Sequence, residues 1–150
     1  MFKVEATETY PVKREQVWDA YTDHAGWRNW AFVSTSKLDK EGSPTKNGVG
    51  AVRILGSAGI NSYEEVTLFQ PYDRMEYGVV KGGLPFKGHK AIVLFQEVPQ
   101  GTRIHWSCTF ESKVFGIGWL MKLITQWVYS STLKSFKKYP FASSAVTQAG

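Results

Sequence analysis

The sequence has little of the chemistry that holds a metal or a disulfide, because it contains one cysteine, Cys108, and three histidines in 150 residues. A single cysteine excludes an internal disulfide and a cysteine-based zinc site. The histidines lack metal-ligand spacing such as H-x-x-x-H, so we expect no metal. Glycine patterns that cradle phosphates or present a nucleophilic serine are also missing, and we expect no cofactor.

The sequence also lacks a long hydrophobic run. The most apolar stretch, residues 114–133, contains Lys122 and Gln126, and it falls short of the roughly 18 uncharged residues that a membrane span needs. The first residues, MFKVE, have no apolar signal-peptide core. We therefore expect a cytoplasmic protein. Its length suits a single domain, expected over residues 1–140, with a mobile polar tail over 141–150.

Acidic residues are missing from the end of the chain, where none follows Glu111. Residues 1–75 hold nine Lys or Arg and ten Asp or Glu, whereas the remainder holds nine and three, a net charge of +6. Two interpretations stay open: a solvated lysine face, or weak, salt-sensitive contact with an anionic membrane through Lys134, Lys137 and Lys138. Nucleic acid is not an expected partner, because the basic residues do not alternate with aromatics on a strand platform.

Aromatic residues are plentiful, at 15% of the chain, and they form part of clear periodic patterns. In residues 103–110, Ile104, Trp106, Cys108 and Phe110 alternate with polar residues, which predicts a half-buried strand. Residues 116–138 instead show a helical period. Its apolar stripe consists of Ile117, Met121, Ile124, Val128, Thr132 and Phe136.

The same reasoning predicts further strands and two short helices. Strands are expected over residues 2–10, 32–38, 49–55, 63–69, 74–80, 90–98 and 102–111, and short helices over 13–21 and 26–30. Strands joined by short turns pair antiparallel, and only the last helix is long enough to cover their apolar face. We therefore predict an α+β fold in which a curved antiparallel sheet of six to seven strands wraps around a long C-terminal helix. Such a sheet leaves a gap beside one helix, which predicts an aromatic-lined pocket.

Five segments in this order resemble the polyketide cyclase/dehydrase-like branch of the START and birch-pollen-allergen superfamily, known as SRPBCC. Residues 101–107, GTRIHWS, are the most specific of them. The other four are residues 12–30, 64–71, 75–85 and 116–120. The resemblance implies the helix-grip fold with a deep hydrophobic cavity between sheet and C-terminal helix. It does not imply one activity, because members include cyclases, dehydratases, and carriers of lipids or hormones.

The candidate ligand-binding residues are those expected on the inner faces of the strands and of the last helix. Aromatic side chains supply apolar contact area, and tyrosines add an orienting hydroxyl. The expected lining consists of Trp30, Glu64, Val66, Tyr77, Trp106, Phe110, Met121, Thr125 and Val128.

Two residues are candidates for acid–base catalysis. Glu64 shares the inward parity of Val66, and burial in an apolar pocket raises the pKa of a carboxyl. It has a structural alternative, which is an ion pair with Arg53 on a neighbouring strand. A bulge would put Glu65 inward in its place. His89 follows the 82–85 loop, near the expected cavity mouth. His24, at the end of the first short helix, is instead expected to be a cap or surface residue.

Three functions remain open on the sequence. The first is a carrier or sensor that binds a small hydrophobic or aromatic molecule, lipid-like or polyketide-like. The second is a cyclase or dehydratase that uses a cavity carboxylate or histidine as general acid or base. The third is a lipid carrier that docks on a membrane surface through the basic last helix, with Trp119 and Trp127 off its main stripe. The sequence also leaves open whether the protein is a monomer or a homodimer.

Overall fold

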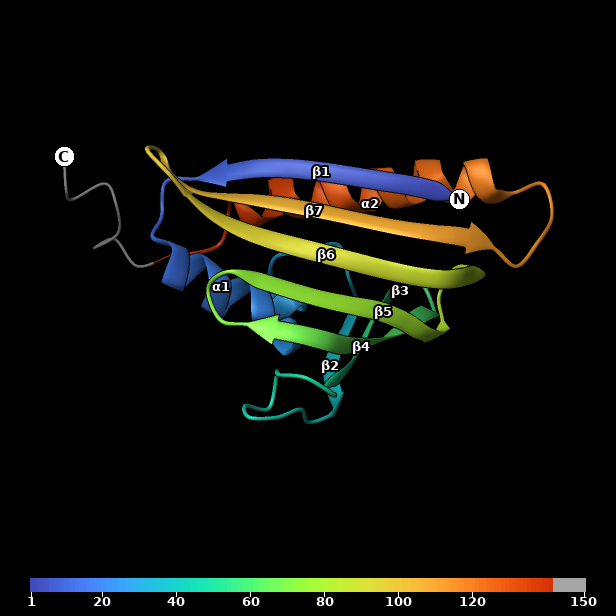
Figure 1. Ribbon diagram of the computed structural model, residues 1–150, viewed down its shortest axis with the longest axis horizontal. Coiled ribbons are helices and arrows are strands. Elements are labelled where there is room, and N and C mark those ends of the chain that lie inside the picture. The colour runs from blue at the N-terminus through green and yellow to red at the C-terminus, as the bar shows by residue number, and fades with distance from the viewer. Residues whose placement is uncertain (142–150) are drawn as a thin grey trace.

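The computed structural model describes residues 1–141, so the expected tail, Phe141 apart, lies outside the described residues. One antiparallel sheet runs in the order β1-β7-β6-β5-β4-β3-β2 (Figure 1). This arrangement confirms the predicted fold class. The strands are β1 (Phe2–Tyr10), β2 (Thr35–Lys40), β3 (Val52–Ser57), β4 (Ile60–Gln70), β5 (Arg74–Gly82), β6 (Phe86–Val98) and β7 (Gly101–Ser112).

Three helices complete the fold: α1 (Arg14–Thr22), a short 3₁₀ helix η1 (His24–Asn29) and α2 (Gly118–Phe136). The first two carry the chain from β1 to the opposite edge of the sheet, where η1 lies against β2. The long helix α2 packs mainly on β1, with a smaller contact on β7 (Figure 1). Because α2 packs on β1 and β7, this helix leaves the inner face of β3, β4 and β5 uncovered.

The period-2 patterns match the observed burial. Along β7, Ile104, Trp106, Cys108 and Phe110 are all buried, as the alternation predicts. Two residues with left-handed backbones, Ala58 and Gly59, form the turn between β3 and β4. A two-residue turn with left-handed backbone conformations matches the right-handed twist of the two strands that it joins.

One inward position in β4 differs from the strict alternation. Val66 is buried as expected, but the register shifts between Val66 and Leu68. Phe69 then turns to the core, and its ring lies 5.0 Å from that of Trp18. A bulge adds one residue to a strand and so reverses the faces beyond it, which moves Leu68 off the core face.

The buried face of α2 also differs from the predicted stripe. Met121, Thr132 and Phe136 are buried as expected, but Ile124 and Val128 are exposed. The remaining inward positions are held by residues such as Thr125, Tyr129 and Leu133. The prediction was wrong here because α2 also carries apolar residues on its outer side, so periodicity does not identify a single face.

Aromatic rings join the short helices to the sheet and to α2. The Tyr21 ring meets those of Trp27, Phe95 and Phe136 edge-on, with centroids 5.1 to 6.1 Å apart. The Tyr10 hydroxyl donates a 2.6 Å hydrogen bond to the Leu133 carbonyl, which ties β1 to α2. Among residues 1–141, no helix is both long and apolar enough to cross a membrane.

Candidate functional site

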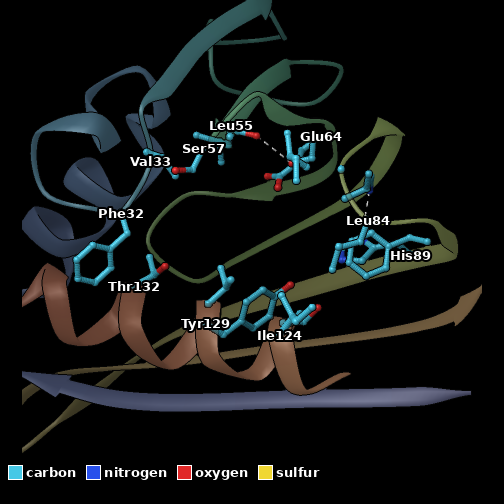
Figure 2. A pocket seen from close by; sticks show the side chains of 18 of the residues that line it. Phe32, Val33, Leu55, Ser57, Glu64, Leu84, His89, Ile124, Tyr129 and Thr132 are labelled. Atoms are coloured by element: carbon cyan, nitrogen blue, oxygen red, sulfur yellow. Dashed lines mark hydrogen bonds between the residues drawn. The ribbon is translucent and has the colours of Figure 1, made fainter. Parts of the chain in front are cut away.

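A cavity of about 330 Å³ lies between α2 and the part of the sheet that this helix leaves uncovered. Strands β3, β4, β5 and β6 form one wall, and α2 forms the other (Figure 2). Phe32 and Val33, which follow η1, lie at one end, and Leu84 and His89 lie at the other. The volume is in the range of small-molecule sites, roughly 300–1,000 Å³.

The cavity has an interior and a mouth that differ in exposure. Interior groups such as Trp27, Tyr77 and Trp106 are almost fully buried. At the mouth, apolar side chains that line the cavity are open to solvent, and they come from three separate elements. They are Phe32 (65% exposed), Ile60 (58%), Ile124 (39%) and Val128 (41%).

The structure brings five of the nine expected ligand-binding residues to this cavity. They are Glu64, Tyr77, Trp106, Thr125 and Val128. His89, the second candidate for catalysis, lines it as well. Their part in binding or catalysis stays a proposal.

The other four residues do not line the cavity, so the expected lining needs correction. Val66, Phe110 and Met121 are buried in the closed core. Phe110 packs between the rings of Phe2 and Phe86, with ring centroids 5.7 and 4.9 Å away. Trp30 packs on Trp27 and Phe136, with ring centroids 4.9 and 4.5 Å away.

Glu64 forms an ion pair across the β3–β4 ladder. Arg53 lies directly opposite in register, and its guanidinium Nη2 is 2.9 Å from Glu64 Oε1. The Arg53 side chain is 1% exposed, and that of Glu64 is 12% exposed because it borders the cavity. Burial raises the pKa of Glu64, and the Arg53 charge opposes that shift. Glu64 keeps the inward position, although the register shifts just before it.

A hydrogen-bonded set of aromatic side chains adjoins this pair. The Arg53 guanidinium lies over the Tyr77 ring, 4.7 Å from its centroid. Trp106 Nε1 donates a 3.0 Å hydrogen bond to the Tyr77 hydroxyl oxygen. We call Arg53, Glu64, Tyr77, Trp106 and Tyr129 the polar cluster.

The two tyrosine hydroxyls of the polar cluster have hydrogen-bonding capacity to spare. Tyr77 and Tyr129 place their oxygens 3.4 Å apart, beyond the roughly 2.5–3.0 Å of a good hydroxyl pair. Burial raises the pKa of both phenols well above the usual value, so both stay neutral donors at pH 7. The Tyr129 ring is stacked on Trp106 with centroids 3.7 Å apart, which fixes its direction. An acceptor atom of a ligand could therefore accept a hydrogen bond from one of these hydroxyls.

His89 is held as a neutral ring. The Val79 N–H donates to His89 Nδ1 at 3.2 Å, so Nδ1 carries no proton and the neutral ring carries it on Nε2. Burial lowers the pKa of His89 to about 4. At pH 7 this side chain is a hydrogen-bond donor rather than a cation.

Thr125 supplies a further polar atom to the cavity. It is buried on α2, and its Oγ1 has no hydrogen-bond partner among the described residues. A buried hydroxyl without a partner costs free energy, and a bound polar group would remove that cost. The cavity is thus apolar in most of its wall, with a few fixed polar groups.

Several residues that line the cavity were not predicted from the sequence. Phe32 was expected in a strand, but β2 begins only at Thr35, so Phe32 is free to lie at the mouth. Leu84 lies in the 82–85 loop, which was expected near the cavity mouth, so its position could have indicated that it lines the cavity. Ser62 keeps the inward parity of Glu64 and could have been found from the alternation.

The remaining reactive groups lie away from the cavity or are inert. Cys108 is buried in the core, and burial raises the pKa of its thiol to about 11. His105 lies on the other face of β7, 2.8 Å from Thr7 Oγ1. His24 was expected at the surface, but it is buried and stacked on Trp27. In the described part of the chain, no group of three or more His, Cys, Asp or Glu side chains could hold a metal.

Comparison with known proteins gives matches to a family and to solved folds. Residues 1–139 match the family model described as polyketide cyclase/dehydrase and lipid transport. No curated protein sequence matches the chain. A START superfamily protein from Mycobacterium smegmatis superposes with a TM-score of 0.77 over 99% of both chains, at 12% identity.

Two other solved structures show the same arrangement. Protein XoxI from Bacillus cereus has a TM-score of 0.75 and 18% identity, over 92% of this chain and 94% of its own. Ara h 8.0201 has a TM-score of 0.72 and 14% identity, over 92% of this chain and 96% of its own. At such identities the likeness extends to the fold alone.

Proposed function

Because the chain belongs to the polyketide cyclase/dehydrase and lipid transport family, we propose that it binds a small hydrophobic or aromatic molecule in this cavity, as a carrier or sensor. The observation that carries the proposal is the cavity of about 330 Å³, which has an apolar wall and an open apolar mouth. Ligand pockets are mostly apolar, with a few placed polar groups that orient the ligand. A cytoplasmic location is part of the proposal.

The polar groups define the ligand more closely. Tyr77, Tyr129 and His89 offer neutral donors, and the Glu64 carboxylate offers an acceptor. The other lining groups are largely apolar or aromatic. We expect a ligand with an aromatic or aliphatic body and one hydroxyl or carbonyl group at the end that enters first. A ligand of high charge is disfavoured, because the cavity would strip its water without a matching free charge.

Two features favour binding over catalysis. The Glu64 carboxylate already accepts a hydrogen bond from Arg53, which holds it as a structural ion pair. His89 has its Nδ1 occupied by the Val79 amide, and its low pKa makes it a weak base. An efficient general base has a pKa close to the working pH.

A second candidate function is a cyclase or dehydratase reaction, and one observation favours it. Glu64 and His89 both line the same apolar cavity, which is where an acid–base pair would have to act. Glu64 would take a proton from a carbon beside a carbonyl of the bound molecule and return it to the hydroxyl group that leaves as water, while the His89 Nε2–H donates a hydrogen bond to the carbonyl oxygen. Turnover that is lost in Glu64→Gln and kept in Glu65→Gln would favour this function over simple binding.

The binding proposal is tested with 1-aminoanthracene, a neutral aromatic probe of three fused rings. We expect saturable binding to the full chain, seen as a rise in probe fluorescence. Thr125→Phe places a ring into the cavity, and Leu123→Phe places the same ring on the exposed side of α2. We expect Thr125→Phe to lower the affinity for the probe at least tenfold, and Leu123→Phe to leave that affinity unchanged.

A variant at the mouth gives a second test of the proposal if Thr125→Phe misfolds. Val128→Trp enlarges a side chain that is already partly exposed, so it leaves the core intact while it narrows the opening. Thermal unfolding of each variant checks the fold. Equal probe affinity in wild type, Thr125→Phe and Val128→Trp would show that the probe does not enter this cavity, and the proposal would fail.

A further inference from the structure

The long helix and the loop before it carry most of the exposed apolar surface. Of fourteen large hydrophobic side chains that are exposed in the described residues, eight lie between positions 114 and 128. The loop contributes Val114 and Phe115, and Phe115 is fully exposed. We define the outer face of α2 as Trp119, Leu120, Leu123, Ile124, Trp127 and Val128.

This surface is continuous with the cavity mouth. Ile124 and Val128 belong to the outer face and also line the cavity. Trp127 is stacked with Phe32, another mouth residue, with ring centroids 6.2 Å apart. A flat apolar partner placed on the outer face would therefore also cover the opening. Exposed apolar patches of this kind mark sites of contact with a protein or a membrane.

The charges around the outer face are of one sign. From residue 112 to 141 every charged side chain is a lysine, and no acid follows Glu111. Lys113 and Lys122 flank the loop and the first turns of α2, and Lys134 and Lys138 lie towards its other end; all four are exposed. The segment thus presents positive charge beside apolar and aromatic side chains.

Acids of the adjoining strand β1 neutralise only one of these lysines. Glu8 of β1 is paired with Lys137, with Nζ and Oε1 3.0 Å apart. Glu5 of β1 is paired with Lys3 and His105. Among the described residues, Lys113, Lys122, Lys134 and Lys138 form no salt bridge, so the segment keeps a net positive charge.

We propose that the outer face of α2, together with the loop before it, docks on an anionic lipid surface. Tryptophan and phenylalanine favour the headgroup boundary, and lysines favour an anionic leaflet. Lysine is depleted in protein–protein interfaces, which argues against a protein partner. Docking would place the cavity mouth against the lipid, so that a hydrophobic ligand passes between the two without crossing water. That use of docking rests on the proposed function, whereas lipid binding itself does not.

The test is co-sedimentation of the full chain with phosphatidylcholine vesicles, with and without one third phosphatidylserine. We expect sedimentation with the anionic vesicles only, and weaker sedimentation in high salt because screening reduces lysine attraction. Phe115→Ser and Trp119→Ser lie away from the cavity, and each should lower partitioning about tenfold. Val80→Ser on β5 removes an apolar side chain that is as exposed as Trp119, at 60%, so it is the matched control and should have no effect.

The lysines are tested separately. Lys122→Glu and Lys134→Glu should each lower partitioning more than fivefold in low salt and little in high salt. Lys87→Glu on β6 is the matched charge control and should have no such effect.

Three results would overturn the docking proposal. These are no sedimentation of wild type in low salt, equal binding by Phe115→Ser, Trp119→Ser and wild type, or a dimer in light scattering that Trp127→Ser dissociates, which would make this face an interface between two copies. The Phe115, Trp119 and lysine variants are also titrated with 1-aminoanthracene, and we expect unchanged affinity for the probe. Probe binding without vesicle binding overturns docking alone, and the reverse overturns the proposed function alone.

Discussion

Arg53 and Glu64 face each other across β3 and β4, and their side chains meet in an ion pair at the inner wall of the cavity, with Nη2 and Oε1 2.9 Å apart. The arginine is almost completely buried, whereas the carboxylate borders the cavity. The pair therefore links the stability of the sheet to the polarity of the site. Replacing Arg53 and replacing Glu64 should therefore have different consequences.

We predict that Arg53→Met strongly destabilises the protein. It leaves the Glu64 carboxylate in an apolar wall without its partner, which costs about 3–5 kcal/mol of unfolding free energy. The double variant Arg53→Met with Glu64→Leu should recover much of this loss, because no charge is then left unpaired. Urea denaturation measures both. A loss below about 1 kcal/mol in Arg53→Met would mean that the ion pair is not important to the fold.

Glu64→Gln should alter ligand binding more than Glu65→Gln does. Only Glu64 borders the cavity, whereas its neighbour points to the other face of β4. We expect a change in 1-aminoanthracene affinity for the first variant and none for the second. The same result for both would leave Glu64 with a structural role only.

Thr125→Val should stabilise the ligand-free protein. The Thr125 hydroxyl is buried without a partner, and valine has nearly the same shape without the polar atom. We expect a gain of about 1 kcal/mol in the free energy of unfolding. Thr22→Val on α1 is the comparison and should lose stability, because the buried Thr22 hydroxyl donates a 2.8 Å hydrogen bond to the Trp18 carbonyl. A loss of stability in Thr125→Val would show that the hydroxyl is satisfied in solution.

His24 should make the protein less stable in mild acid. Burial lowers the pKa of His24 well below 6.5, and the nearby Arg53 charge lowers it further. The unfolded chain takes up a proton near pH 6.5 while the folded chain does not, so this part of the stability is present above pH 6.5 and is lost as the pH falls. Glu64, with a raised pKa, acts in the opposite direction.

A variant isolates the histidine. Between pH 6 and pH 5, wild type should lose up to about 1.4 kcal/mol per pH unit more than His24→Gln. Urea denaturation at the two pH values measures the difference. Parallel pH dependence in wild type and variant would contradict the burial of a neutral His24.

Cys108 should resist thiol reagents in the folded state. Its side chain is buried, and a pKa of about 11 leaves almost no thiolate at pH 8. Labelling of the folded protein with iodoacetamide, measured by mass spectrometry, should be at least a hundredfold slower than labelling of the protein unfolded in urea. Fast labelling of the native protein would place this thiol at the surface.

The sequence predicted the features that depend on strict alternation. Ile104 to Phe110 could be assigned to one buried face because the polar residues between them all point the other way. The Arg53–Glu64 pair was an explicit alternative, since adjacent strands bring such residues opposite each other. These features follow from local geometry.

The remaining features depend on tertiary contacts that periodicity does not encode. The bulge in β4 exchanges Leu68 for Phe69 at the core, and no single residue type announces it. Ile124 and Val128 were expected in the buried stripe of α2, but they lie partly exposed at the cavity mouth, since α2 also carries apolar residues on its outer side. His24 looked like a surface cap, but the Trp27 ring covers it and the Thr22 carbonyl accepts from its Nδ1–H.

The central claim is that the cavity between α2 and the sheet holds a hydrophobic molecule. Native mass spectrometry on protein purified from its own host tests it most directly, with wild type and Val128→Trp prepared side by side. We predict that wild type carries a non-covalent adduct of small-molecule mass, and that Val128→Trp carries much less of it. An adduct of equal occupancy in both would place the ligand elsewhere, and wild type with no adduct and no affinity for 1-aminoanthracene would contradict the account.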